Sequence, residues 1–136
     1  MKKISVVCIL FFCCKVVSQN YTRQDSLRGS ITEERVWWDL KQYQLNVNVD
    51  LDRKTIKGAN TIFYTVLKKN NSMQIDLQPP MKIDQITQDG KNLKFKSEGN
   101  AHFISLEKTQ TIGSDQKLTV FFSGKPPSAK NAPWDG

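Results

Sequence analysis

The stretch Tyr43-Gln44-Leu45-Asn46-Val47-Asn48-Val49-Asp50-Leu51 alternates strictly between apolar and polar side chains. Successive side chains of a β-strand point to opposite faces of the sheet, so this period of two predicts a strand with one buried face. The apolar set, at positions 43, 45, 47, 49 and 51, is expected to pack against the core. No other segment of the chain carries so clear a secondary-structure signal.

Alternating or β-prone runs along the rest of the chain predict further short strands. They lie at residues 55–67, 73–77, 83–88, 91–97, 102–107 and 117–123. Gly58 in the first of these runs indicates a bulge or a close approach of another backbone segment, and Asp89-Gly90 is a strong two-residue hairpin signal. About seven short strands and no convincing helix predict an all-β fold, either an antiparallel β-sandwich or a saddle-like sheet.

The 136 residues leave room for one folded domain after a targeting segment. Two lysines precede an apolar run at residues 4–14, which has the length of a signal-peptide core and is too short to cross a bilayer. We therefore predict a signal peptide at residues 1–18, cleaved after Ser18 or one residue later. A lipoprotein anchor on Cys13 or Cys14 is the less favoured alternative, because large side chains precede them where a lipobox has a small residue.

The remainder of the chain divides into three parts by composition. Residues 19–34 are polar and show no sustained period, which predicts a flexible leader. Residues 35–124 contain the predicted strands and form the β domain. Residues 125–136 form a Pro-rich tail, which we expect to lead into further sequence, because Trp134 has little to pack against at the end of a finished small domain.

Removal of residues 1–18 changes both the charge and the cysteine content. Three of the 20 basic residues and all three cysteines are lost, leaving 17 basic against 13 acidic residues and a formal charge of 17 − 13 = +4. An exported chain without cysteine has no disulfide, no cysteine nucleophile and no thiolate metal site. The modest charge does not indicate a nucleic-acid partner, and no transmembrane segment is predicted after cleavage. We expect the product in the periplasm or outside the cell.

The sequence carries no recognisable catalytic or metal-binding constellation. It has no HExxH zinc motif, no G-x-S-x-G nucleophile elbow and no Gly-rich phosphate loop. His102 is the single histidine, and its position in a predicted strand favours a surface or cross-strand role. Asp50 and Asp52 place two carboxylates at one strand end, but Arg53 and Lys54 follow directly and favour a solvated turn over a calcium or acid–base site. No catalytic residue and no metal ligand is assigned.

The three tryptophans are the candidate contact residues for another domain. Trp37 and Trp38 are adjacent, and adjacent side chains of an extended chain face opposite ways, so both are not expected to enter one core. One of the two is therefore a candidate interface residue, and Trp134 in the tail is a further candidate. The other aromatic residues mostly occupy alternating positions that predict core packing rather than a stacking platform for sugars or bases.

Several segments, taken in order, resemble the opening of the aminopeptidase N family of zinc metallopeptidases, the gluzincin aminopeptidases. The segments that carry the resemblance are residues 43–50, residues 54–62, Ile75-Asp76-Leu77-Gln78, the Asp89-Gly90 hairpin, Leu118-Thr119-Val120-Phe121-Phe122-Ser123-Gly124 and Ala132-Pro133-Trp134-Asp135-Gly136. The last segment, together with Trp37-Trp38-Asp39, is similar to secreted bacterial members. The resemblance covers about residues 35–136.

The resemblance implies an N-terminal, non-catalytic β domain of an exported enzyme, truncated before its catalytic domain. The GxMEN and HExxH-(x18)-E motifs of the family belong to that following domain, so zinc is expected there and no cofactor in this chain. The parent activity would be hydrolysis of N-terminal residues from peptides by zinc-activated water. This chain would pack against the catalytic domain of the same polypeptide and shield it, would meet peptide substrate only through the parent, and would be inactive alone.

A second interpretation stays open beside the first. The chain could be a free-standing secreted β-sandwich that binds a protein or a glycan. A domain separated from its partner should expose a contiguous apolar patch of several hundred Å², whereas a finished binding module should present a confined groove with aromatic and polar groups.

Overall fold

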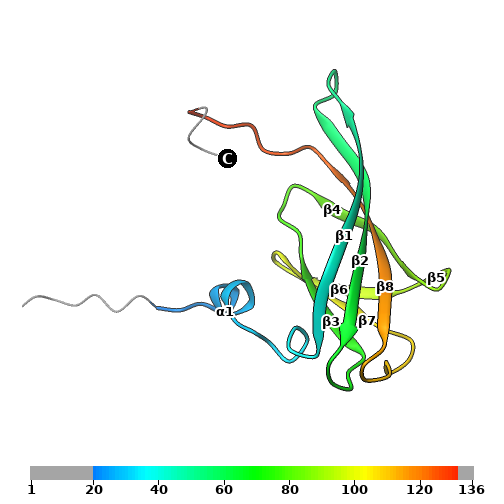
Figure 1. The fold of residues 1–136 in the computed structure, drawn as a ribbon. Coiled ribbons are helices and arrows are strands. Elements are labelled where there is room, and N and C mark those ends of the chain that lie inside the picture. The colour runs from blue at the N-terminus through cyan, green and yellow to red at the C-terminus, as the bar shows by residue number, and fades with distance from the viewer. Residues whose placement is uncertain (1–19, 132–136) are drawn as a thin grey trace, which may run out of the picture.

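The computed structural model describes residues 20–131 and contains a short helix followed by strands (Figure 1). The predicted signal peptide and the end of the tail, including Trp134, lie outside these described residues. In chain order the elements are α1 (Arg23–Gly29), β1 (Trp38–Asp50), β2 (Thr55–Val66), β3 (Ser72–Asp76), β4 (Lys82–Gln88), β5 (Lys91–Asn92), β6 (Lys94–Glu98), β7 (Ala101–Ser105) and β8 (Asp115–Gly124).

The strands form two antiparallel sheets, which confirms the predicted all-β class. Sheet A has five strands in the order β1-β2-β8-β4-β5, and sheet B has three in the order β3-β7-β6. β1 therefore lies at one edge of sheet A, and β3 lies at one edge of sheet B. The longest strand pairings of sheet A are those of β2 with β1 and with β8. In Figure 1 the tip of the β1–β2 hairpin projects beyond the other strands.

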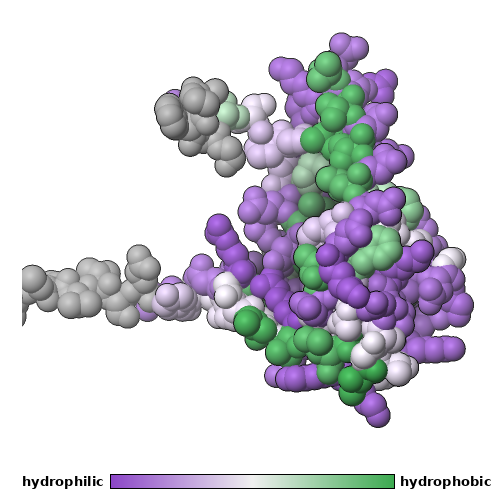
Figure 2. Space-filling view, viewed as in Figure 1, coloured by the Kyte–Doolittle hydropathy of each residue, from purple (hydrophilic) through white to green (hydrophobic). Residues whose placement is uncertain are grey.

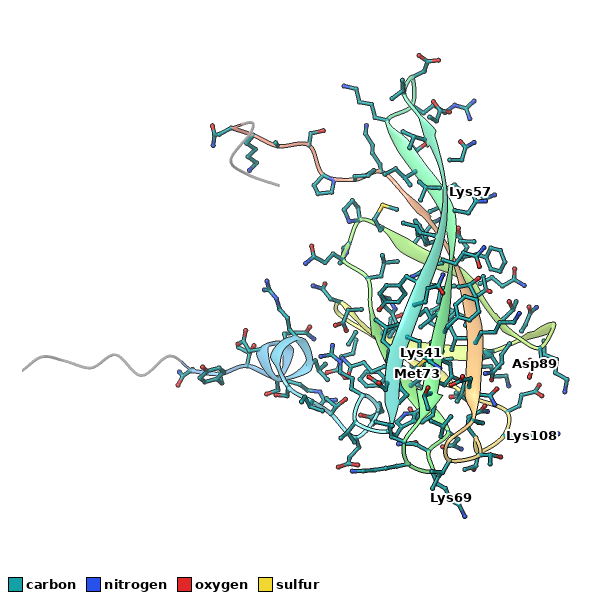
Figure 3. All side chains as sticks on the ribbon, viewed as in Figure 1. Lys41, Lys57, Lys69, Met73, Asp89 and Lys108 are labelled. Atoms are coloured by element: carbon teal, nitrogen blue, oxygen red, sulfur yellow. The ribbon has the colours of Figure 1, made fainter. Side chains whose placement is uncertain are left out.

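The hydrophobic core lies between the two sheets, at one end of sheet A. Side chains on the inner face of sheet A meet those of sheet B and of the loops beside it in a single buried cluster. Its members are Trp37, Ile62, Tyr64, Val66, Met73, Ile86, Leu93, Ile104, Leu106, Leu118 and Val120. In Figure 3 Met73 lies among these closely spaced side chains, whereas Lys57 marks a level of β2 well beyond them. Sheet B thus covers only part of sheet A.

The predicted leader contains a helix that the sequence did not indicate. Thr22 caps α1 through a capping box: its hydroxyl accepts a hydrogen bond from the backbone N–H of Asp25, whose carboxylate accepts one from the backbone N–H of Thr22. Leu27 is buried, and Arg23 forms an ion pair with Glu98 on β6. A helix of seven residues with one apolar side chain has no visible period, and its stability depends on the cap and on docking.

The hairpin predicted at Asp89-Gly90 is confirmed, but the strand predicted to follow it is not continuous. Asp89 and Gly90 both adopt positive φ, as a two-residue hairpin between β4 and β5 requires. The strand predicted at residues 91–97 is, however, divided between β5 and β6, which belong to different sheets. Leu93, the residue at the division, is buried, and its backbone N–H donates to the carbonyl of Ile86.

Gly58 marks a close approach of neighbouring groups. It pairs regularly with Val47, and the irregularity of the β1–β2 ladder lies elsewhere, between Leu40 and Gln42. A Cβ atom at Gly58 would stand 2.5 Å from the carbonyl oxygen of Asn46 and 2.8 Å from the Phe122 ring. The absence of a side chain at position 58 therefore leaves room for this ring beside β2.

Candidate interaction surface

The apolar face of β1 is exposed, and the expectation that it packs against the core is wrong. The residues concerned, between 41% and 82% exposed, are Tyr43, Leu45, Val47, Val49 and Leu51, called the hairpin face below. Figure 2 shows hydrophobic residues following one another along the projecting part of the hairpin. Exposed apolar surface of this extent and continuity is typical of a contact surface.

The cause of this exposure is the length of the hairpin relative to sheet B. Tyr43 is paired with Ile62, which is 3% exposed, and the same face continues through Val49, which is paired with Ile56. One inner face therefore runs the length of the hairpin, buried at one end and open at the other. The alternation identified the apolar face correctly, but no second layer covers its outer half within residues 20–131.

A groove of about 780 Å³ lies where the covered and open parts of this face meet. Its floor comes from β2 and β8, one wall from β1, and the opposite wall from β3 and the segment after it. The segment between α1 and β1 closes one end. The apolar lining residues are Ile31, Val36, Trp38, Leu40, Tyr43, Leu45, Ile62, Ile75, Leu77, Val120 and Phe122. The groove is thus the open side of the sandwich, between its two edge strands.

The charged groups of the groove are paired with each other. Arg35 forms an ion pair with Asp76, and the Arg35 guanidinium also donates to the carbonyl of Ser30 at 3.2 Å. These two opposite charges offset each other, so the groove offers no net charge to an ionic partner. A neutral, largely apolar binding partner fits such a lining best.

Asn60 carries the one buried side-chain polar atom that has no hydrogen-bond partner among the described residues, and it lines the groove. Its side-chain oxygen Oδ1 is buried and accepts no hydrogen bond there. The residue is paired with Leu45 on one side and with Val120 on the other, so the amide lies between apolar neighbours. A buried acceptor without a donor costs about 1–3 kcal/mol, and such groups are rare in native proteins.

Gln74 of β3 fixes the segment that closes the groove. This fully buried side chain donates through Nε2 to the carbonyl of Leu27 at 3.0 Å and accepts from the hydroxyl of Thr32 at 2.9 Å. Its backbone N–H donates to the carbonyl of Glu34 at 3.1 Å. The predicted flexible leader is therefore attached to the edge of sheet B at three points, and it carries Ile31 into the groove wall. Sequence reasoning missed Gln74, because its partners are distant in sequence.

The two adjacent tryptophans both contact the ring of Tyr64. Trp37, which is 1% exposed, and Trp38, which is half-buried, each make an edge-to-face contact at 5.9 Å between ring centroids. The expectation that adjacent side chains diverge fails here because Trp37 lies in the turn before β1 and only Trp38 is in the strand. Trp37 is a core residue whose indole N–H donates to the carbonyl of Ser72, and Trp38 lines the groove.

The remaining sequence candidates take structural positions. His102 is buried rather than on the surface, and it is a cross-strand residue: its Nδ1 lies 2.8 Å from the hydroxyl of Ser97 and its Nε2 lies 3.3 Å from the carbonyl of Leu77. Asp50 accepts a hydrogen bond from the backbone N–H of Arg53, which closes the hairpin turn. Within residues 20–131, no three His, Cys, Asp or Glu side chains come together in a way that could hold a metal ion. No helix of that part is long and apolar enough to cross a bilayer.

The groups with shifted pKa values are not among the residues that line the groove. The ion pair with Arg23 lowers the pKa of Glu98, and hydrogen bonds from Lys41 and Thr65 lower that of Asp115. Burial raises the pKa of Tyr64, whose hydroxyl accepts a hydrogen bond from Gln88.

Comparison with known proteins places the fold. No protein-family model and no curated protein sequence matches the chain. Among solved structures it is similar to the M1 zinc metallopeptidase of Deinococcus radiodurans, with a TM-score of 0.61 and 14% sequence identity over 75% of this chain. A mutant of that enzyme bound to a Tyr-Ser-Ala substrate gives the same values. A structure of a two-domain M1 zinc metallopeptidase mutant bound to L-tryptophan gives a TM-score of 0.60 at 13% identity.

These similarities concern part of each known structure. The matched region covers 24% of the Deinococcus radiodurans chain and 23% of the two-domain enzyme. At this level of identity the likeness establishes the architecture, whereas activity depends on sites that a fold does not specify. The chain has the fold of a β-rich portion, about one quarter in length, of M1 zinc metallopeptidases.

Proposed function

We propose that this chain is the N-terminal, non-catalytic β domain of an exported zinc metallo-aminopeptidase of the secreted bacterial type. Its role is to pack against the catalytic domain of the same polypeptide and to shield that domain's active site. The observation that carries the proposal is the exposed hairpin face on a fold shared with M1 zinc metallopeptidases. The order of motifs in residues 35–136 supports the same assignment.

The exposed surface favours this role over that of a free-standing binding module. The hairpin face is a continuous row: Tyr43 and Leu45 line the groove, and the row continues beyond it along the projecting hairpin. It is an extension of the same apolar face that sheet B buries further along β2. A second layer placed over it would continue the sandwich, which is how a domain normally buries such a face.

Zinc in this proposal belongs to the catalytic domain. The residues described here do not fit a zinc site, since no cluster of suitable ligands exists among them and the sequence lacks HExxH. No catalytic step is therefore assigned to this chain. As a direct consequence, the isolated chain should release no amino acid from an aminoacyl reporter substrate, and turnover by a zinc-free preparation would contradict the proposal.

The first experiment is to sequence the locus through and beyond the Gly136 codon. The expected result is an open frame that continues into an HExxH region. A genuine stop codon after Gly136 would remove the catalytic partner from the same polypeptide. The alternative of a secreted module that binds a protein or a glycan would then be preferred.

The second experiment places the same charges on the two faces of β1 in the continued polypeptide. V47E/V49E introduces two carboxylates on the hairpin face, and N46E/N48E introduces two on the opposite face of the same strand. Burying unpaired carboxylates against a partner domain is strongly unfavourable, so the first pair should lower aminopeptidase yield and activity by about tenfold or more. The second pair is the matched control and should leave both nearly unchanged. Equal effects from the two pairs would contradict packing through the hairpin face.

A further inference from the structure

β1 is an edge strand, and the outer side of its backbone has no strand beside it among the described residues. It lies at the end of sheet A, and every residue from Asp39 to Val49 is exposed. Natural proteins usually protect such an edge with a proline, a lysine or a β-bulge, because an open edge can add a strand from another chain. The bulge of β1 lies between Leu40 and Gln42, and residues 42–49 contain no charged residue and no proline. This part of the edge is therefore open to pairing.

The hydrogen bonds of β2 identify which backbone groups of β1 face outward. The backbone N–H of Val66 donates to the carbonyl of Ser114, on the β8 side, and that of Leu67 donates to the carbonyl of Trp37, on the β1 side. Backbone groups alternate in direction along a strand, so the odd-numbered residues of β2 bond to β1. Their partners on β1 are the even-numbered residues 42–50, whose backbone groups point inward. The outward N–H and C=O groups therefore belong to Tyr43, Leu45, Val47 and Val49.

We propose that β1 pairs through this edge with the β1 strand of a second copy of the chain. The two strands run antiparallel about a two-fold axis at Asn46. Tyr43 then stands opposite Val49 of the copy, and Leu45 stands opposite its Val47. Because these are the residues with outward backbone groups, each pair exchanges two hydrogen bonds, and the four pairs along the edge form about eight. The occupant is a second copy because the backbone edge requires a β-strand, and β1 itself has the sequence that fits.

The side chains of β1 fit this register on both faces of the sheet. On the hairpin face the opposed side chains are aromatic or branched aliphatic, and such cross-strand pairs stabilise an antiparallel sheet. On the outer face Gln44 stands opposite Asn48, and Asn46 stands opposite its own copy, so neutral amides can donate to and accept from each other. Gln42 stands opposite Asp50, and no two like charges meet along residues 42–50. A strand without this alternation would place polar side chains beside the apolar row.

Pairing through this edge produces a closed dimer. A two-fold axis perpendicular to the sheet uses the same edge in both molecules. The opposite edge of sheet A is β5, which has only two residues and offers little for further pairing. The two hairpin faces lie on the same side of the joined sheet and stay exposed, because their side chains point away from the sheet rather than along its edge. The inference thus goes beyond the proposed function, which uses the face of β1 and not its backbone edge.

Amide hydrogen exchange of the wild-type chain, with the predicted signal peptide removed, tests the pairing without any substitution. The four outward amides should exchange freely in dilute solution, and at least about tenfold more slowly in concentrated solution. The inward amides of Gln44, Asn46 and Asn48 should be protected under both conditions, because they bond to β2. Protection that alternates along β1 and depends on concentration is specific to pairing through the edge. Sedimentation of the same samples should show a monomer that is replaced by a dimer.

A single cysteine at the two-fold axis tests the register. The native cysteines all lie in residues 1–18, so Asn46→Cys gives the processed chain one thiol. In the proposed dimer the two thiols stand directly opposite in a pair whose Cα atoms are about 4.5 Å apart, which permits a disulfide. Asn48→Cys is the matched control on the same face, and its two copies are separated by four residues, roughly 13 Å. Disulfide formation should be at least about tenfold faster for Asn46→Cys.

Three results would overturn the inference. One is exchange of the outward amides that stays unprotected as the protein concentration rises. Another is a disulfide that forms as readily from Asn48→Cys as from Asn46→Cys. The third is a dimer without alternating protection, which would indicate contact through the hairpin faces instead. None of these results bears on the aminopeptidase yield of V47E/V49E, so the two proposals can fail separately.

Discussion

The side-chain amide of Gln74 donates a hydrogen bond of 3.0 Å to the main-chain carbonyl of Leu27, across 47 residues of sequence. Both residues are buried, and the contact joins the helix α1 to the edge strand of sheet B. The same amide accepts from Thr32, so one side chain holds two points of the segment before β1. That segment forms the closed end of the groove, and its position therefore depends on Gln74.

Replacing Gln74 by methionine should release this segment. The substitution keeps an unbranched side chain of similar length but leaves the carbonyl of Leu27 and the hydroxyl of Thr32 without a partner. We expect a loss of about 1–3 kcal/mol in the free energy of unfolding, together with faster amide exchange in α1. Thr32→Val removes only one of these bonds and should cost less. Equal losses from the two variants would show that Gln74 is not the shared anchor.

Replacing valine by alanine at two positions of the inner face of sheet A should distinguish the half of that face covered by sheet B from the exposed half. Val66→Ala removes two methyl groups from a fully buried position and should cost about 2–3 kcal/mol in unfolding free energy. Val49→Ala makes the same change where the side chain is 56% exposed and should stay within about 0.5 kcal/mol. Chemical denaturation of the isolated chain provides both values. A cost at Val49 as large as that at Val66 would mean that the hairpin face is already covered.

The ion pair between Arg23 and Glu98 should make the docking of α1 sensitive to acid. The hydrogen bond and charge of Arg23 lower the pKa of Glu98 in the folded chain. The resulting stabilisation is present above the unfolded value of about 4.3, and it is lost as the pH falls through the lower folded pKa. Amide chemical shifts of α1, followed from neutral pH to about pH 2, should report this loss. Glu98→Gln should remove this component and leave the one that comes from the Asp25 carboxylate in the capping box. Glu107→Gln, which affects the distant pair with Lys91, should leave both components in place.

Adding a methyl group at two glycines should give opposite results. Gly58→Ala brings a Cβ within 2.5 Å of the Asn46 carbonyl oxygen, a main-chain atom of the paired strand that cannot move away freely. We expect a loss of about 1–3 kcal/mol from this overpacking. Gly29→Ala meets no atom within 4 Å and lies at the end of α1, where alanine is favoured over glycine by about 0.5–1 kcal/mol. Thermal unfolding of the two variants measures the contrast, and a tolerated alanine at position 58 would contradict the close approach.

Much of the fold could be predicted, because the sequence pattern reports local geometry. The alternation at residues 43–51 identified both the strand and its apolar face, and Asp89-Gly90 identified a turn that requires positive φ. What covers the apolar face could not be predicted, since alternation records only that one side is hydrophobic. The helix α1 was missed because its stability comes from a capping box and from contacts with β3 and β6, which no local period shows.

Only some of the residues of the candidate surface could be predicted from the sequence. The sequence pointed to the tryptophans, and Trp38 does line the groove, but Trp37 belongs to the core. The groove itself combines residues from positions 31 to 122, and the unpartnered oxygen of Asn60 arises from how three strands align. Such features depend on strand order and register, which the sequence pattern leaves open.

β2 runs from the part of sheet A that sheet B covers into the part that is exposed, and this affects the entropy of association. At one end β2 contributes Ile62, Tyr64 and Val66 to the core, and at the other it is hydrogen-bonded to the β1 strand that carries the hairpin face. The core therefore holds β1 in its extended shape in the isolated chain. Ordering a backbone costs about 1–2 kcal/mol per residue, and a partner that docks on this hairpin does not meet that entropic cost on this side of the interface.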